Sequence, residues 1–175
     1  MAGTLIEINP VTRITTGYIG QPGKRVFYLQ AQKEREVVTL LIEKQQVEAL
    51  AYGIEQFLQE LQEKFPSLDE VPADYVTSAM TLQVPVDPAF RIGQLGLGYD
   101  QDRDLLVLVA QEVVPEGREA EDASVARFFA TRAQMRALSH YGLLLVKQGR
   151  PICGNCGQPM DAEGHFCPRS NGHAH

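Results

Sequence analysis

The order of sequence patterns repeats along this chain, and the repetition constrains the fold more than any single motif does. The stretch YLQAQ, which ends at Gln32, returns as VLVAQ, which ends at Gln111. The stretch QVEAL, which begins at Gln46, returns as QMRAL, which begins at Gln134. In each half, three stretches rich in β-branched and aromatic residues precede one stretch with helical periodicity. The shared order favours an internal duplication of a β-β-β-α unit.

Both predicted helices have recognisable ends. The first begins at Lys44 and ends before Pro66, because apolar residues recur at helical spacing between them and proline stops a helix. The second begins after Thr131, a suitable N-cap, and ends at Gly149. A β-β-β-α unit alone leaves an apolar face in water, so the two repeats are expected to share one sheet. The predicted fold class is α+β: tandem β-β-β-α repeats forming a mainly antiparallel sheet with two long helices on one face, plus a small C-terminal zinc knuckle.

The predicted organisation is one duplicated α+β domain, residues 1–149, followed by a zinc-knuckle tail, residues 150–175. With 44% hydrophobic residues, the chain can bury a core of its own. Within the domain, repeat one covers about 11–64 and repeat two about 89–149. The linker between them, about 65–88, is rich in proline and is expected to lack long elements.

A glycine-rich stretch that begins at Gly17, GYIGQPGKR, lies where a nucleotide-binding protein carries its phosphate loop. A Walker A loop requires the spacing GxxxxGK followed by Ser or Thr. Here Gly17 lies one residue too far from Gly23, and Arg25 replaces the hydroxyl residue. Proline followed by glycine instead predicts a type II turn over residues 21–24, with Gly23 supplying the positive φ. Phosphate binding is therefore not predicted for this stretch.

The last part of the chain contains a motif for a bound metal. All three cysteines lie there, and Cys153 and Cys156 form a CxxC pair that is followed by glycine. His165 and Cys167 supply two further donors after a polar connector. Three thiolates and one imidazole suit a closed tetrahedral Zn site that stabilises a small fold. The spacing between His165 and Cys167 is tight, so His173 remains the alternative fourth ligand.

Four glutamines recur at equivalent positions of the two halves and form a candidate polar site at the seam between the repeats. They are Gln32, Gln46, Gln111 and Gln134. The alternative is that they cap strand ends or helix starts, as polar side chains often do. His140 belongs to no motif that supplies a nucleophile, so we interpret it as a structural or solvated histidine. No catalytic residue is predicted.

The charge of the chain disfavours some partners. A formal net charge of -6 argues against broad attachment to nucleic acid, which depends on Lys and Arg. No apolar run is long enough to cross a bilayer, and the start of the chain lacks the pattern of a secretory signal. Cysteines confined to one short stretch suit a metal site in a reducing compartment better than disulfides. We therefore expect a cytoplasmic protein without a membrane partner.

In its repeats and its tail, the chain resembles an uncharacterised family of bacterial two-repeat proteins with a C-terminal Cys/His zinc-knuckle-like tail, a domain of unknown function. The matching stretches are GQPGKRVFYLQAQ, LIEKQQVEAL, FRIGQLGLGYD and GRPICGNCGQPMDAEGHFCPRSNG. The resemblance implies no assigned activity and no catalytic residue. The gene neighbourhood of the family implies a kinase-like or phosphatase-like protein partner, and in some cases a link to low-molecular-weight thiol synthesis.

The first functional hypothesis is a noncatalytic, zinc-containing binding or adaptor protein whose exposed sheet face or edge receives a partner. The alternative is an enzyme of phosphate or low-molecular-weight thiol metabolism, which requires a concave pocket with a perturbed acid or base. The second alternative is an RNA-binding protein. It would use the zinc knuckle, with Lys147, Arg150 and Arg169 near the cysteines and Phe166 available for stacking.

Overall fold

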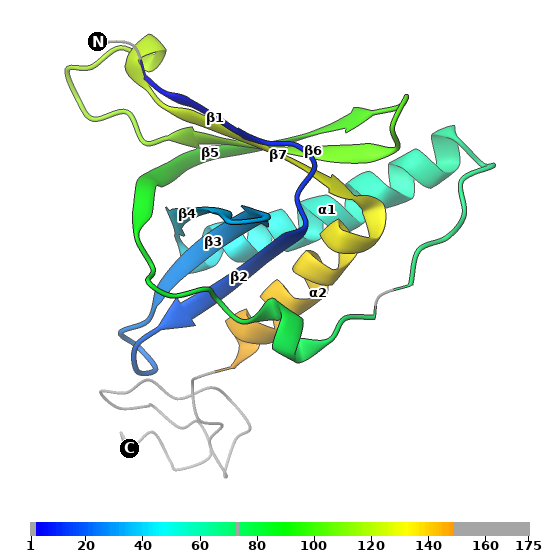
Figure 1. Ribbon diagram of the computed structural model, residues 1–175, viewed down its shortest axis with the longest axis horizontal. Helices are drawn as coiled ribbons and strands as arrows, with labels where there is room; N and C mark the ends of the chain where they lie inside the picture. The colour runs from blue at the N-terminus through cyan, green and yellow to red at the C-terminus, as the bar shows by residue number, and fades with distance from the viewer. Residues whose placement is uncertain (1–2, 73, 149–175) are drawn as a thin grey trace, which may run out of the picture.

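The strands are rich in β-branched and aliphatic residues whose side chains point alternately to the two faces of the sheet, and the helices have apolar residues with a period near 3.6. The computed structural model describes residues 3–72 and 74–148 (Figure 1). In chain order the main elements are β1 (Leu5–Ile8), β2 (Arg13–Ile19), β3 (Val26–Lys33), β4 (Glu36–Ile42), α1 (Lys44–Lys64), β5 (Pro88–Asp100), β6 (Leu105–Glu112), β7 (Val125–Thr131) and α2 (Arg132–Lys147). Two short 3-10 helices, η1 (Thr77–Met80) and η2 (Ala120–Asp122), lie in the connections. The predicted α+β class is confirmed.

The strands form one mixed sheet in the order β1-β7-β6-β5-β4-β3-β2. Consecutive strands pair antiparallel from β2 to β4 and from β5 to β7, whereas β1 with β7 and β4 with β5 are parallel. The prediction of a mainly antiparallel sheet did not include these two parallel pairs. The second of them arises because the long strand β5 first runs beside β4, as far as Arg91, and from Ile92 onward runs beside β6.

A similar crossing lies between β1 and β2. The backbone amide of Val11 donates to the carbonyl of Phe129 in β7, and the amide of Thr12 donates to the carbonyl of Gln32 in β3, both at 2.8 Å. The chain therefore leaves β7 and joins β3 within two residues. The two edges of the sheet meet at this crossing, and Figure 1 shows the sheet curving around the helices.

The hydrophobic core lies between the inner face of the sheet and the two helices. Leu29, Leu108 and Phe128 are completely buried strand residues, and they belong to one cluster with the apolar stripes of α1 and α2. Because both stripes join the same cluster, both helices lie on the same face of the sheet. Burial of this apolar surface supplies the main stabilisation of the fold.

Polar residues fix the start of each helix. Thr131 is the N-cap of α2, as predicted, and its hydroxyl accepts a hydrogen bond from the amide of Gln134 at 3.0 Å. Glu43 occupies the corresponding position before α1, and its amide donates to the side-chain oxygen of Gln46 at 2.8 Å. Among the helices in the described part of the chain, none combines the length and the apolar character that a membrane crossing needs.

The glycine-rich stretch forms the predicted type II turn. The backbone amide of Lys24 donates to the carbonyl of Gln21 at 2.8 Å, which closes the turn. Gly23 adopts a φ of 86°, a conformation that glycine reaches without the steric cost that a side chain imposes. The stretch therefore joins β2 to β3 as a hairpin loop.

The proline-rich linker crosses the outer face of β2, β3 and β4. We call residues 66–72 and 74–87 the strap, and Figure 1 shows it leaving α1, passing α2 and reaching the sheet. Its Leu82 lies against Gly17 in β2, where an added β-carbon would meet the Leu82 Cγ at 2.6 Å. Thr15 and Thr39 are consequently buried, although they point away from the helices. The linker thus acts as a third layer over the first half of the sheet.

Candidate binding surface

The capping glutamines of the two helices reach the two strand crossings. The Nε2 of Gln46 donates to the carbonyl of Ile92 at 3.1 Å, inside β5. The Nε2 of Gln134 donates to the carbonyl of Val11 at 3.4 Å, between β1 and β2. The Oε1 of each glutamine accepts the N-cap amide of its own helix at 2.8 Å. Both ends of each side-chain amide are therefore engaged with the backbone.

The other two predicted glutamines lie on the strands at the same crossings. Gln32 pairs through its backbone with Arg13, and Gln111 pairs in the same way with Gln94. The Nε2 of Gln32 donates to the carbonyl of Glu34 at 2.9 Å, while its Oε1 is buried without a partner. The predicted set is thus distributed over two seams, with Gln32 at one crossing and Gln111 at the other.

A buried glutamine that the sequence analysis did not single out fastens the strap to the sheet. Gln30 is only 1% exposed. Its Nε2 donates to Thr39 Oγ1 at 3.0 Å and to the carbonyl of Gln83 at 3.1 Å, and its Oε1 accepts the Gln83 amide at 2.7 Å. The hydroxyl of Thr15 donates to the carbonyl of Met80 at 2.6 Å. A glutamine among apolar strand residues was the available signal, because a buried amide needs such partners.

The corresponding positions of the second half are open. Gly98 of β5 precedes a tyrosine near a hairpin, as Gly17 of β2 does. A β-carbon added at Gly98 would find its nearest neighbour, the Cβ of Val107, only at 3.9 Å. One added at Gly96 would meet nothing within 4 Å. Across the described residues, no segment therefore covers these glycines as Leu82 covers Gly17.

We call the exposed outer side of β5, β6 and β7 the open face. Strand register places two rows of side chains across it, formed by Gly98, Val107 and Phe129 and by Gly96, Val109 and Arg127. The valines and Phe129 are half-buried. The Arg103 guanidinium lies 5.2 Å from the centroid of the Phe129 ring, and Arg127 pairs with Glu7 at 3.1 Å. Arg103 is also ion-paired, with Asp100 at 2.9 Å. The open face is thus a shallow apolar surface flanked by two ion-paired arginines, an arrangement suited to binding polypeptide.

A groove of about 330 Å³ borders the open face between α1 and β5. It is lined by Gln46, Ala49, Leu50, Gly53, Gly93, Leu95, Gly96 and Leu97. Pairing of β5 with β4 ends at Arg91, so the strand runs beside the helix from there on. Gly93 is required at the bend, because an added β-carbon would lie 2.9 Å from the Cα of Val113. Apart from Gln46, the remaining lining residues are small or aliphatic, which makes the groove mainly apolar.

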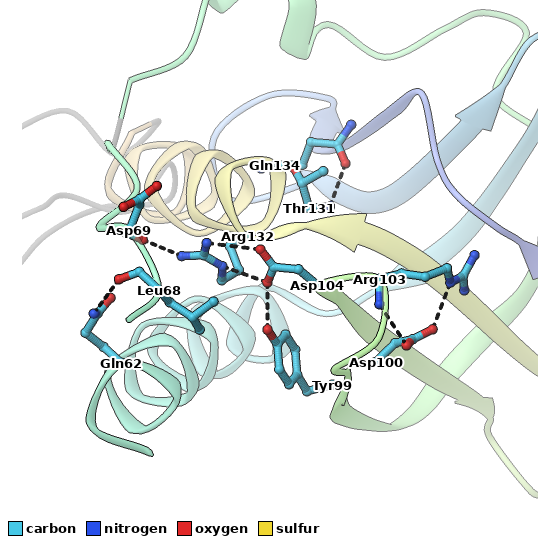
Figure 2. A network of polar contacts seen from close by, with 10 residues as sticks. All are labelled: Gln62, Leu68, Asp69, Tyr99, Asp100, Arg103, Asp104, Thr131, Arg132 and Gln134. Atoms are coloured by element: carbon cyan, nitrogen blue, oxygen red, sulfur yellow. Dashed lines mark hydrogen bonds and ion pairs between the residues drawn. The ribbon is translucent and has the colours of Figure 1, made fainter. Parts of the chain in front are cut away.

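A charged network braces the far end of the second half (Figure 2). Arg132 donates to both carboxylate oxygens of Asp104, from Nε at 2.9 Å and from Nη2 at 3.1 Å. Its Nη1 donates to the carbonyl of Asp69 in the strap at 2.6 Å. The hydroxyl of Tyr99 donates to Asp104 Oδ1 at 2.7 Å. The network therefore joins the β5–β6 hairpin, the start of α2 and the strap.

The network fixes the charge of its members. The Arg132 guanidinium, hydrogen-bonded to Asp104, lowers the pKa of that carboxyl below its usual range. Burial, aided by the hydrogen bond to Asp104, raises the pKa of Tyr99 to about 12. At neutral pH the network thus contains a carboxylate, a guanidinium and a neutral phenol. These states suit a structural clamp, because none of the three groups changes protonation near pH 7.

A second polar cluster faces a cavity of about 630 Å³. His140 Nε2 lies 2.8 Å from Glu55 Oε1, and the hydroxyl of Ser139 donates to the same oxygen at 2.7 Å. Arg136 Nη2 lies 3.5 Å from Glu55 Oε2. In a Ser-His-acid triad the imidazole lies between the serine and the carboxylate. Here the carboxylate lies between them, so His140 does not take the proton of Ser139.

The predicted metal ligands Cys153, Cys156, His165 and Cys167 lie outside the described residues, as does the alternative His173. In residues 3–72 and 74–148, no group of three His, Cys, Asp or Glu side chains is placed to hold a metal ion. The donor set of the tail, three thiolates and an imidazole, is the set that zinc prefers. The zinc site therefore stays a prediction from the sequence.

Residues 6–167 match DUF3090, a family described as protein of unknown function. The chain belongs to this family. The description of the DUF3090 family names no activity, so the function of this DUF3090 protein is argued from its own residues. The match ends at Cys167 and includes all four predicted ligands, whereas His173 lies beyond it. No curated protein and no solved structure matches the chain.

Proposed function

We propose that this DUF3090 protein is a noncatalytic, zinc-containing binding or adaptor protein that receives a protein partner on its open face. The observation that supports the proposal is the difference between the two halves of the sheet. The strap covers the outer side of β2, β3 and β4, whereas no segment within the described residues covers the outer side of β5 and β6 at Gly96 and Gly98. Half-buried apolar residues at the centre of a surface, with arginine beside them, are typical of protein interfaces.

We also propose that the two halves are tandem copies of one β-β-β-α unit. Gln46 and Gln134 support this, because each caps a helix and bonds a strand crossing in the other half. Gly17 and Gly98 support it as well, since each lies one residue before a tyrosine in the first strand of its unit. In this organisation, the open face of repeat two corresponds to the face of repeat one that the strap covers. Such a surface is suited to receiving an extended segment of chain.

The tail is proposed to hold zinc through Cys153, Cys156, His165 and Cys167. The end of the family match at Cys167 favours His165 over His173 as the fourth ligand. Zinc bound by four protein ligands stabilises a local fold and leaves no position for a substrate. A closed site of this kind supports a binding role over a catalytic one.

Affinity capture with matched variants tests the binding proposal. The Val107→Lys change introduces a charge into the centre of the open face, and Val26→Lys introduces the same charge at an exposed valine of β3. The kinase-like and phosphatase-like proteins implied by the family's gene neighbourhood are the first partners to test. We expect the wild type and Val26→Lys to retain the partner. We expect Val107→Lys to retain at least about tenfold less of it. Equal retention by all three would contradict the role of the open face.

The cavity beside Glu55 favours a second candidate, an enzyme of phosphate or low-molecular-weight thiol metabolism. Arg132 and Arg136 line this cavity together with the carboxylates of Glu55 and Glu70. An anionic substrate would have to displace the contacts of Arg136 with Glu55 and with the carbonyl of Val71. Turnover of phosphate esters or thiol conjugates, abolished by Glu55→Gln, would support this candidate. Absence of turnover with both substrate classes would remove it.

A further inference from the structure

We infer that the C-terminal segment of this chain, residues 149–175, docks in the groove between α1 and β5. The inference rests on the two-repeat organisation proposed above, and it deepens the proposed function. Docking there places the cysteine-rich tail at the border of the open face. The partner surface then consists of the open face and the metal-binding tail together.

In the first half, the corresponding space is already filled by the strap. Tyr75 of the strap packs edge-on against Tyr141 of α2, with ring centroids 5.5 Å apart. The Nε of Arg13 in β2 donates to the carbonyl of Ala79 at 2.6 Å. The strap therefore occupies the space between α2 and the first strand of its repeat. This is the chain segment that follows the helix of repeat one, as residues 149–175 follow the helix of repeat two.

The groove between α1 and β5 has a glycine where the strap-filled space of the first half has a large side chain. Tyr141 follows Gln134 at the same interval at which Gly53 follows Gln46. Glycine thus leaves open, on α1, the place where tyrosine meets the strap on α2. Gly96 opens the strand side in the same manner, since an added β-carbon there would meet nothing within 4 Å. Glycine inside a strand often marks a site where another backbone approaches closely.

The C-terminal segment starts near the end of the groove that contains Gln46. A β-carbon added at Gly142, near the end of α2, would lie 3.1 Å from Val47 in the first turn of α1. Further along α1, Glu55 contacts Arg136, which lies nearer the start of α2. The helices are therefore antiparallel, and α2 ends beside the first turn of α1. The groove begins in that turn, at Gln46.

The length and the residues of the segment fit the groove. The end of α2 and the groove lie on different sides of α1. An extended chain advances about 3.3 Å per residue, so the stretch that precedes Cys153 is about 13 Å long, enough to cross the first turn of α1, about 10 Å wide, and to enter the groove. This stretch contains Pro151 and Ile152, whose apolar side chains suit walls formed by Leu50 and Leu95. The polar and metal-binding residues follow and remain at the border of the open face.

A photo-crosslinking experiment on the full-length protein tests the docking. Benzoylphenylalanine replaces the exposed groove residue Ala49 in one sample and Glu60, which is exposed on α1 beyond the groove, in the control. After irradiation, peptide mass spectrometry identifies the linked residues. We expect position 49 to link to residues 149–175 within one chain and position 60 to form no such link. Absence of the link at position 49, or links only between chains, would overturn the inference.

Hydrogen exchange of the tail gives a second measurement. The Gly53→Leu change fills the groove with little strain, because the added β-carbon has its nearest neighbour, Leu97 Cδ1, at 4.0 Å. We expect amides of residues 149–175 to exchange at least about fivefold faster in this variant than in the wild type or in Glu60→Leu. Equal exchange in all three proteins would overturn the docking. It would leave the capture result with Val107→Lys untouched, so the two proposals fail separately.

Discussion

Gln30 is almost completely buried, and its side-chain amide meets the strap and β4. A buried amide costs free energy unless its polar atoms are bonded. Because the amide and the carbonyl of Gln83 are both matched by this side chain, Gln30 acts on the strap as a neighbouring strand would. The residue therefore determines where the strap lies on the sheet.

A Gln30→Leu change tests this role. Leucine leaves the backbone of Gln83 and the hydroxyl of Thr39 without these partners, so we expect the free energy of unfolding to fall by about 2–4 kcal/mol. Urea denaturation measures the change. The control is Gln111→Leu, at a half-buried strand end, which should cost less than about 1 kcal/mol. Similar losses for the two variants would show that Gln30 does not hold the strap.

Asp104 should contribute stability in a pH-dependent way. Its folded-state pKa is lowered, so its contribution is present above the unfolded pKa of about 3.9 and is lost as pH falls through the folded value. We expect Asp104→Asn to lower the free energy of unfolding by about 1–2 kcal/mol at pH 7, a modest figure because the carboxylate is partly exposed. At pH 3 the difference from wild type should shrink. The exposed neighbour Asp102, changed to asparagine, provides the control, and a difference that is equal at both pH values would contradict the assignment.

Tyr99 should act at the opposite end of the pH scale. A tyrosine in the unfolded chain titrates near pH 10, whereas the pKa of Tyr99 is raised to about 12 in the folded protein. Its contribution is therefore complete below pH 10 and is lost as pH rises toward 12. We expect the stability of Tyr99→Phe to fall less steeply between pH 10 and 12 than that of the wild type. Denaturation curves over this range measure the slope, and a slope equal to that of the wild type would contradict the assignment.

At the scale of elements, local sequence patterns predicted the helices and turns better than the pairing of the strands. Helical spacing from Lys44, the N-cap at Thr131 and the Pro-Gly turn each depend on neighbours in the sequence, and all three were found. The parallel pairs of β1 with β7 and β4 with β5 depend on residues far apart, so no local pattern indicates them. The proline-rich linker was expected to lack long elements, and nothing in its own sequence indicated that it would cover the sheet. The strap is held there by side chains of β2 and β3, which are distant in the sequence.

A pair of glycine variants compares the two halves directly. We expect Gly17→Leu to lower the free energy of unfolding by about 1–3 kcal/mol, because the new side chain must displace Leu82. We expect Gly98→Leu to change stability by less than about 0.5 kcal/mol, since the space beside it is open. Chemical denaturation measures both. Equal destabilisation would mean that the second half is covered as tightly as the first.

At the scale of the whole molecule, the sequence indicated a set of recurring glutamines but not the surface that we propose as the binding site. The glutamines at positions 46 and 134 were chosen for their recurrence, and they lie at the two strand crossings. The open face was not predicted, because it is defined by a strap that covers one half and not the other. Only the folded chain reveals that difference. The cysteine-rich tail lies outside the described residues, and its metal site is a prediction from the sequence.

The two halves give the protein a division of roles. The first half, fastened by its strap, is covered on both faces of the sheet. The second half offers the open face and the groove beside it. Together with the zinc site proposed for the tail, these surfaces are proposed to bind a partner without chemistry. The central claim is therefore that the proposed zinc site is structural.

Cobalt substitution of the purified full-length protein tests this claim most directly. Cobalt replaces zinc in thiolate sites, and its d–d absorption reports the number and kind of its ligands. We predict a strong tetrahedral spectrum that does not change when azide is added, because Cys153, Cys156, His165 and Cys167 fill every position. A spectrum that shifts with azide, or a protein that takes up no cobalt, would contradict the closed zinc site and with it the noncatalytic role.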